Sequence, residues 1–318
     1  MAKFTIITPV FNGADYIEET VLSVFEATKD IDIEYLIVDD GSTDKTRELL
    51  EKYSTGIEYV YQENSGQAAA INKGLELASG LYATIVNADD PLLTNKLFLE
   101  AEKIMDREPR VVATYPDWNM IDSSGKIVET IFVKDFDPVE LIGKFNCLIG
   151  PGGVFRTDIA KSVKGWDPNY RFVPDYDFWL RLSEKGVFRH VPEIQATWRT
   201  HETSISIASR SGAMAEERIR VINEFLKRNP QTSVSLKNMA VAHSHYRAAV
   251  LSYFDGRIDG RNLLITSIKR YPRILIEKDL RVSLFILFLP VSRLIVKMLL
   301  RFKYIRNLEA NLRRSLNS

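Results

Sequence analysis

Two pairs of adjacent aspartates are the residues of this chain best suited to chemistry. Asp39 and Asp40 follow one short apolar run, and Asp89 and Asp90 follow another. Carboxylates held close together repel one another unless a cation or hydrogen-bond donors neutralise their charge. Their oxygens suit Mg²⁺ and Mn²⁺, which keep coordination positions open for phosphate oxygens. Since aspartate is also common where loops begin, turn formation is the alternative for each pair. Two such pairs, without a glycine-rich phosphate loop, favour a divalent metal site.

Short strands that alternate with helices must position these aspartates. The predicted strands, rich in β-branched and aromatic residues, are Phe4–Thr8, Tyr35–Val38, Ile57–Tyr61 and Tyr82–Val86. One helical face between the first two strands carries the apolar residues Ile17, Val21, Val24 and Phe25. Ser42 or Thr43 is the expected cap of the next helix. This alternation implies mainly parallel pairing, with both aspartate pairs at neighbouring strand ends and ligands beyond those ends.

The later sequence predicts a mixed sheet followed by helices. Val111–Val133 contains further strands, with a hairpin turn at Ser123–Gly125. Asp175–Lys185 has a helical pattern, and the segments 240–254 and 260–270 predict an antiparallel helical hairpin. The predicted fold class is therefore α/β, a mixed sheet flanked by helices with a helical C-terminal extension.

Composition limits the compartment and the partners. The 318 residues include 42 basic and 42 acidic side chains, so the net charge gives no reason to expect nucleic acid as a partner. Cys147 is the single cysteine and no cysteine–histidine cluster has zinc spacing, which favours a reducing compartment. The apolar run Phe4–Phe11 is too short for the core of a signal peptide. We therefore expect a cytoplasmic protein.

The C-terminal segment 281–318 has a composition of its own. Val282–Ser292 carries no charge, and Arg293, Lys297 and Arg301 then recur at every fourth residue. The uncharged run is shorter than the roughly 20 apolar residues that a spanning helix needs. A basic amphipathic helix behind an apolar run predicts a segment that lies in a membrane interface and is attracted by anionic lipids. The alternative is a packing helix with a solvated basic face.

Four motifs, in order along the chain, resemble those of family 2 glycosyltransferases. They are Thr8–Asn12, Val38–Asp44, Gly66–Gly74 and Asn87–Asp90. The family is inverting and has the nucleotide-sugar-binding GT-A fold, and the resemblance covers about residues 3 to 205. It implies a catalytic domain over 1–205, a helical extension over 206–280 that includes the hairpin, and the membrane-interfacial segment 281–318.

The resemblance also implies roles for individual residues. The nucleotide-sugar contacts would be Pro9, Phe11, Asp40, Gln67 and Asp89, with Asp40 bound to the base and Asp89 near the ribose. Asp90 and His201 would hold Mn²⁺ or Mg²⁺. The chain differs from many relatives in having Ile71 in place of an arginine and Asn87 in place of an acid.

An inverting transfer needs a base that takes the proton of the acceptor hydroxyl. The resemblance places Asp175 in this role, and a helix-capping aspartate is the alternative. Asp177 lies four residues before Arg181, a spacing that predicts a structural ion pair. Gly150–Gly153 resembles an acceptor-side loop, with an ordinary turn as the alternative. Trp179, within the predicted helix, is expected in the core.

The predicted function is metal-dependent transfer of a sugar from a nucleotide-diphosphate donor, a UDP-sugar, to an acceptor hydroxyl. The expected acceptor is a saccharide or lipid-linked saccharide in polysaccharide, capsule or lipopolysaccharide assembly at the inner face of the membrane. A dinucleotide-binding Rossmann protein is disfavoured because no G-x-G-x-x-G follows the first strand. A metal-dependent nucleotidyltransferase and a non-catalytic nucleotide-binding protein of the same fold are the remaining alternatives.

Overall fold

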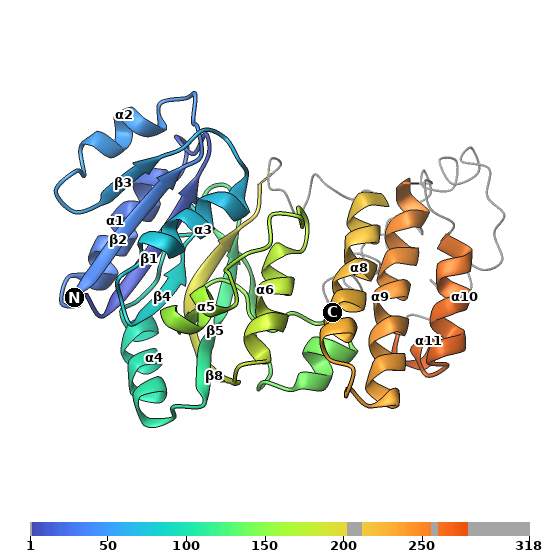
Figure 1. The fold of residues 1–318 in the computed structure, drawn as a ribbon. Helices are drawn as coiled ribbons and strands as arrows, with labels where there is room; N and C mark the ends of the chain where they lie inside the picture. Colours follow the sequence, from blue (N-terminus) through green and yellow to red (C-terminus); the bar gives the residue numbers. More distant parts are fainter. Residues whose placement is uncertain (1, 202–211, 256–259, 279–318) are drawn as a thin grey trace. The chain divides into compact units, whose positions relative to one another are not determined.

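The computed structural model describes residues 2–201, 212–255 and 260–278. The first part of the chain forms an eight-stranded sheet with the order β3-β2-β1-β4-β7-β5-β6, in which β8 pairs with β5. Figure 1 labels β1 to β5 and β8 of this sheet. Its strands are β1 Phe4–Val10, β2 Ile33–Asp39, β3 Glu58–Tyr61, β4 Tyr82–Ile85, β5 Val111–Ile121, β6 Ile127–Ile131, β7 Val154–Arg156 and β8 Val187–Arg199. The helices that accompany the sheet are α1 Ile17–Thr28, α2 Thr46–Glu51, α3 Gln67–Leu77, α4 Lys96–Arg107, α5 Thr157–Ser162 and α6 Pro174–Ser183.

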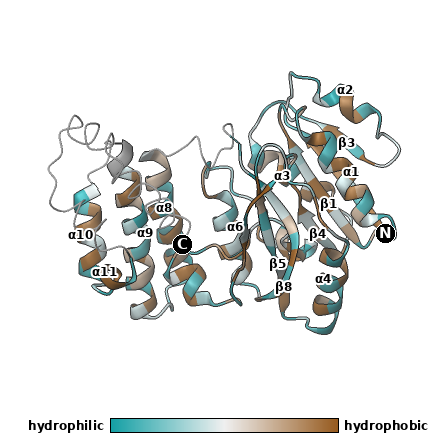
Figure 2. Cartoon of the chain, turned by 180° about the vertical axis from the view of Figure 1, so that it is seen from behind, coloured by the Kyte–Doolittle hydropathy of each residue, from teal (hydrophilic) through white to brown (hydrophobic). Residues whose placement is uncertain are grey.

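The first four strands are parallel, as predicted. Strands β1, β2 and β4 are mainly buried because both faces of the sheet are covered there, whereas the edge strand β3 has only exposed and half-buried residues. On α1, the predicted face is buried, with Ile17, Val21 and Val24 fully inaccessible. On α3, a Cβ built at Gly74 would lie 2.4 Å from Ile7 of β1, so only glycine allows this close approach. Helix α4 shows brown and teal residues along its length (Figure 2), and it buries Leu97, Phe98, Ala101 and Met105.

The second half of the sheet is mixed, which confirms the sequence prediction. β7 runs antiparallel to β4 and β5, and β5 and β6 form an antiparallel hairpin. Gly125 in the hairpin turn has φ +83°, a conformation that favours glycine. The long strand β8 runs parallel to β5. The sequence analysis did not predict β8, because its apolar residues do not alternate regularly with polar ones.

Two local predictions are wrong. Helix α2 begins at Thr46, beyond Ser42 and Thr43, and Asp44 Oδ1 accepts the Thr46 N–H at 2.9 Å. Ser42 instead accepts the Asn12 N–H with its hydroxyl at 2.9 Å. The two aspartate pairs also do not end neighbouring strands, because β1 lies between β2 and β4.

The chain divides into two compact units. One comprises Met1–Asp137 and Cys147–Ile207, and the other comprises Pro138–Asn146 and Ala208–Ser318. The second unit thus includes a short segment from within the range 1–205. Its elements are the π-helix η1 Val139–Gly143, α8 Gly212–Arg228, α9 Val234–Asp255, α10 Gly260–Arg270 and α11 Ile274–Glu277.

Helices α9 and α10 form the predicted helical hairpin around a small apolar core. Its buried members include Tyr246, Val250, Leu264 and Ile274. Most of the predicted turn of this hairpin and the segment 281–318 lie outside the described residues. Among the residues that are described, no helix is both long enough and apolar enough to cross a bilayer.

Candidate active site

Asp90, which follows β4, is a buried carboxyl group with a hydrogen bond to each oxygen. It is 4% exposed. Its Oδ1 accepts the main-chain N–H of Arg199 at 2.7 Å, and its Oδ2 accepts the side-chain amide of Asn87 at 2.8 Å. Burial, together with the charge of Asp89, raises the pKa of Asp90 to about 8. A cation close to this pair would favour the ionised form.

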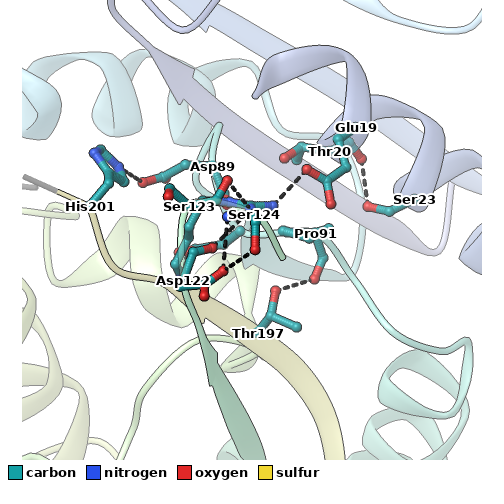
Figure 3. Close-up of polar contacts among 12 residues, drawn as sticks. Glu19, Thr20, Ser23, Asp89, Pro91, Asp122, Ser123, Ser124, Thr197 and His201 are labelled. Atoms are coloured by element: carbon teal, nitrogen blue, oxygen red, sulfur yellow. Dashed lines mark hydrogen bonds and ion pairs between the residues drawn. The ribbon is translucent and has the colours of Figure 1, made fainter. Parts of the chain in front are cut away.

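Asp89 is the more accessible member of the pair and faces His201. The Nε2 atom of His201 lies 2.9 Å from Asp89 Oδ2, and the side chains are 17% and 30% exposed. The ring of His201 points toward the Asp89 carboxylate (Figure 3). The structure therefore brings together two residues that the sequence analysis assigned to different roles, the ribose contact Asp89 and the metal ligand His201.

Asp89 and His201 together offer atoms that can bind a divalent cation, and most of the coordination positions of that cation would remain open for a ligand. A carboxylate oxygen and an imidazole nitrogen suit Mn²⁺, and carboxylate oxygens suit Mg²⁺. Within the described part of the chain, no group of three or more histidine, cysteine, aspartate or glutamate residues could hold a metal. A cation bound at Asp89 and His201 would therefore take its remaining ligands from phosphate oxygens and water.

The pair after β2 is neutralised by hydrogen-bond donors from the protein. Asp40 accepts the Gln62 side-chain amide at 2.7 Å and the main-chain N–H groups of Ser65 and Gly66 at 2.8 Å each. Asp39 accepts the hydroxyl of Tyr59 at 2.6 Å. Asp40 therefore fixes the loop after β3, and Asp39 binds a side chain of β3 itself. This arrangement corresponds to the structural alternative, in which the aspartates organise turns.

The predicted nucleoside contacts lie at the end of β1. Pro9 is buried within β1, and Phe11, one residue past the strand, is 51% exposed. Asn12 has φ +52° and accepts the Thr43 N–H at 2.8 Å. The loops after β1 and β2 are thus hydrogen-bonded to each other, and they leave the Phe11 ring accessible.

Asn87 connects the β4 end to α3. Its amide nitrogen donates to Asp90, and its amide oxygen accepts from Gln67 at 3.2 Å. A carboxylate at this position could not donate to Asp90 and would add a like charge. Asn87, which distinguishes this chain from many relatives, can therefore donate to Asp90 and accept from Gln67 at the same time.

Asp175 occupies the first turn of α6. The N-cap position of α6 is Val173 and Pro174 begins the helix, so Asp175 is not the N-cap residue. Its side chain is half-buried. Burial raises the pKa of the Cys147 thiol, and the nearby charge of Asp175 adds to this effect. The helix start thus places Asp175 beside the segment that precedes the glycine-rich loop.

Asp177, two residues further along α6, is a structural residue as predicted. Its Oδ2 lies 2.7 Å from Arg181 Nη2, and the Asp177 side chain is 2% exposed. Arg181 also donates to the main-chain oxygens of Val163 and Gly165. This pair therefore links α6 to the chain that follows α5.

The glycine-rich loop 150–153 packs closely against aromatic rings. A Cβ built at Gly150 would lie 2.7 Å from the Trp118 ring, and one at Gly153 would lie 3.0 Å from Trp179. Trp179 is 6% exposed and contacts Phe155 among other core rings, which confirms its predicted core position. Packing therefore explains the glycines at positions 150 and 153.

Arg199, the last residue of β8, is a central residue of the site that the sequence analysis did not assign. It is 1% exposed, and its side chain contacts both the β4 end and Glu19 of α1. The only sequence signal is its place two residues before His201. A single arginine carries no periodicity that would reveal burial.

The fold and this site define an α/β protein whose candidate site lies at the carboxyl ends of parallel strands. Residues 5–159 match the family model described as glycosyl transferase family 2. TuaG of Bacillus subtilis strain 168, a glycosyltransferase assigned by name to teichuronic acid biosynthesis, is 34% identical over 212 residues, which are 64% of this chain and 81% of TuaG. This chain belongs to the family 2 glycosyltransferases, which use nucleotide sugars.

A more distant relative is longer than this chain. Escherichia coli chondroitin synthase is 26% identical over 231 residues, which are 70% of this chain and 32% of the synthase. The chain therefore spans about a third of that enzyme.

Two solved structures show the same GT-A fold. S. aureus TarS 1–349 in complex with UDP-GlcNAc has a TM-score of 0.57 at 16% identity, over 86% of this chain and 90% of that one. The mannosyltransferase PcManGT from Pyrobaculum calidifontis, in complex with GDP-Man and Mn²⁺, has a TM-score of 0.60 at 16% identity, over 98% of this chain and 85% of that one. The predicted fold class is confirmed.

Proposed function

We propose that this chain is an inverting, metal-dependent glycosyltransferase that transfers a sugar from a UDP-sugar to a hydroxyl of a saccharide or lipid-linked saccharide. The observation that carries the proposal is the contact between Asp89 and His201, beside the buried Asp90 at the end of β4. The uridine base is supported by the TarS complex with UDP-GlcNAc. Polysaccharide assembly as the pathway is supported by the names of TuaG and chondroitin synthase.

We assign the metal ligands to Asp89 and His201. The sequence analysis placed Asp90 in this role, but each oxygen of Asp90 already accepts a protein hydrogen bond and the side chain is buried. Asp90 acts in this proposal as the support that orients the Asp89 main chain. When bound, Mn²⁺ or Mg²⁺ stabilises the negative charge of the departing diphosphate.

The remaining roles follow the order of the elements along the sheet. Phe11, half-exposed past β1, stacks on the nucleobase, while Pro9 shapes the wall behind it and Gln67 approaches the donor from the start of α3. Asp40 holds the loop that borders the base. Asp175, half-buried in the first turn of α6, takes the proton of the attacking hydroxyl.

The segment 281–318 attaches the enzyme to the inner face of the membrane in this proposal. Its support is the sequence pattern, an uncharged run followed by seven basic residues and one acidic residue. This location would bring the donor site to a lipid-linked acceptor.

Hydrolysis of a panel of UDP- and GDP-sugars in the presence of Mn²⁺ tests the proposed chemistry. We expect release of UDP from one UDP-sugar, and loss of this release with EDTA and in Asp89→Ala. Asp30→Ala, an exposed aspartate after α1, is the matched control and should retain the parent rate. Undiminished turnover by Asp89→Ala with excess chelator would contradict the metal assignment. Donor binding without turnover, even with acceptor saccharides, would favour the non-catalytic alternative.

A further inference from the structure

Arg199 lies at the centre of a hydrogen-bond network that joins three separate segments. Its Nε donates to the main-chain oxygen of Asp89 at 2.9 Å. Its Nη1 donates to the main-chain oxygens of Asp122 and Ser123 at 3.2 and 3.4 Å, and its Nη2 donates to the Glu19 carboxylate at 2.6 Å. Figure 3 labels the residues of these four partners, which lie close together. The guanidinium therefore connects the β4 end, the β5–β6 turn and α1.

The main chain of Arg199 holds the same aspartate pair from a second direction. Its N–H donates to Asp90 Oδ1 at 2.7 Å, while its guanidinium binds the carbonyl of Asp89. Because Asp89 and Asp90 are consecutive, these two bonds fix the orientation of the segment that carries both carboxylates.

Arg199 is also coupled to the ring of His201. The guanidinium carbon lies 4.7 Å from the centroid of the Tyr16 ring, and the Tyr16 centroid lies 5.3 Å from that of His201. His201 follows Arg199 by two residues, so the fixed end of β8 also limits where the imidazole can lie. Arg199 thus restrains both groups of the Asp89–His201 pair.

We propose that Arg199 is a positioning residue of the donor site, whose planar guanidinium holds Asp89 and His201 in the one arrangement that presents both to the same metal–diphosphate ligand. The inference rests on the proposed function, because it assigns Arg199 to the support of the proposed metal ligands. Groups of this kind, one step removed from the metal, tune its affinity by orienting the residues that bind it.

The contacts distinguish positioning from a general effect of positive charge. Three of the four side-chain acceptors of Arg199 are main-chain carbonyl oxygens, one bound by Nε and two by Nη1. A lysine ammonium is a single point charge and cannot reach these acceptors together. Arg199→Lys therefore retains the charge and removes the planar set of donors.

The test is the affinity for Mn²⁺ in the presence of saturating UDP, measured by isothermal titration on the full chain. We expect Arg199→Lys to raise the Mn²⁺ dissociation constant by about 10- to 100-fold. The matched control is Arg189→Lys on the same strand, where the arginine is half-exposed and pairs with Glu108 at 2.7 Å. Its Mn²⁺ affinity should equal that of the parent. Thermal unfolding of both variants separates loss of fold from loss of positioning.

A Mn²⁺ affinity of folded Arg199→Lys within twofold of the control would overturn the inference. If Arg199→Lys does not fold, Glu19→Ala replaces it, because Glu19 is exposed on α1 and supplies one acceptor to Arg199. This variant should weaken Mn²⁺ binding by about tenfold, the lower end of the range for such partners, and an unchanged affinity would again overturn the inference. Asp89→Ala separates the two proposals. If Asp89→Ala leaves Mn²⁺ binding intact, the proposed metal site is wrong, whereas loss of binding in Asp89→Ala alone refutes only the role of Arg199.

Discussion

Acidification should destabilise the helical unit through His243 of α9. This residue is 1% exposed, and its Nε2 lies 3.2 Å from Glu277 Oε2 of α11. Its Nδ1 is buried and has no hydrogen-bond partner within the described part of the chain. Burial, reinforced by the positive charges of Lys278 and Arg247, lowers the pKa of His243 to about 4, although Glu277 opposes the shift. The folded unit therefore favours the neutral imidazole.

The sign and size of the effect follow from proton linkage. Above the ordinary histidine pKa of 6.5, neither the folded nor the unfolded state is protonated, and His243 has no effect on the pH dependence. As the pH falls below that value, His243 becomes protonated in the unfolded chain, whereas in the folded chain it becomes protonated only near pH 4. Between about pH 7.5 and 5 the free energy of unfolding should fall by about 2 kcal/mol.

Urea unfolding of the parent and of His243→Met, followed by circular dichroism at both pH values, isolates this effect. The substitution changes the free energy of unfolding at both pH values. The decrease in this free energy between the two pH values should, however, be smaller in the variant than in the parent by about 2 kcal/mol. His245 of the same helix also has its pKa lowered by burial and remains in both proteins, so its contribution cancels. Equal pH dependence in the two proteins would refute the reasoning.

Three further changes test the site and its surroundings. Asp175→Asn should lower kcat by about 10²- to 10⁴-fold with little change in donor KM, because it removes the proposed base alone; an unchanged kcat in steady-state assays would exclude that role. Asp177→Ala leaves the guanidinium of Arg181 without its carboxylate and should cost about 3–5 kcal/mol in urea unfolding, whereas a cost below about 1 kcal/mol would mean that the pair is effectively solvated. Deletion of 281–318 should release the protein from anionic vesicles, and unchanged cosedimentation would count against membrane attachment by this segment.

The first four strands could be predicted from the sequence because each is a short run rich in β-branched and aromatic residues. β1 is buried along its whole length, and β2 is buried over its last five residues. β8 could not be predicted in this way. Gln195, Thr197 and Arg199 are buried in it, and partners more than a hundred residues away bind Thr197 and Arg199. Polar residues that are satisfied only in the tertiary structure cannot be distinguished from loop residues by composition.

The sequence identified the β4 aspartates as a candidate site but not the difference between them. Which of Asp89 and Asp90 is accessible depends on the Arg199 main chain, which binds one and buries it. In the same way, the donors to Asp40 come from the loop after β3, which no pattern around Asp40 reveals. Pattern analysis finds residue types at strand ends, whereas the role of each carboxylate depends on long-range hydrogen bonds.

The assignment of Pro138–Asn146 to the helical unit has a consequence for how this enzyme can be shortened. A Cβ built at Gly143 would lie 2.7 Å from the sulfur of Met239, and Arg247 donates to Asn146 at 2.6 Å. The polypeptide thus leaves the sheet, contributes one turn to a bundle whose other helices are not yet synthesised, and then returns to finish the sheet. A protein truncated after residue 205 would lack the α9 residues that contact this turn. A minimal enzyme must therefore retain α9, whether or not it retains the helices beyond it.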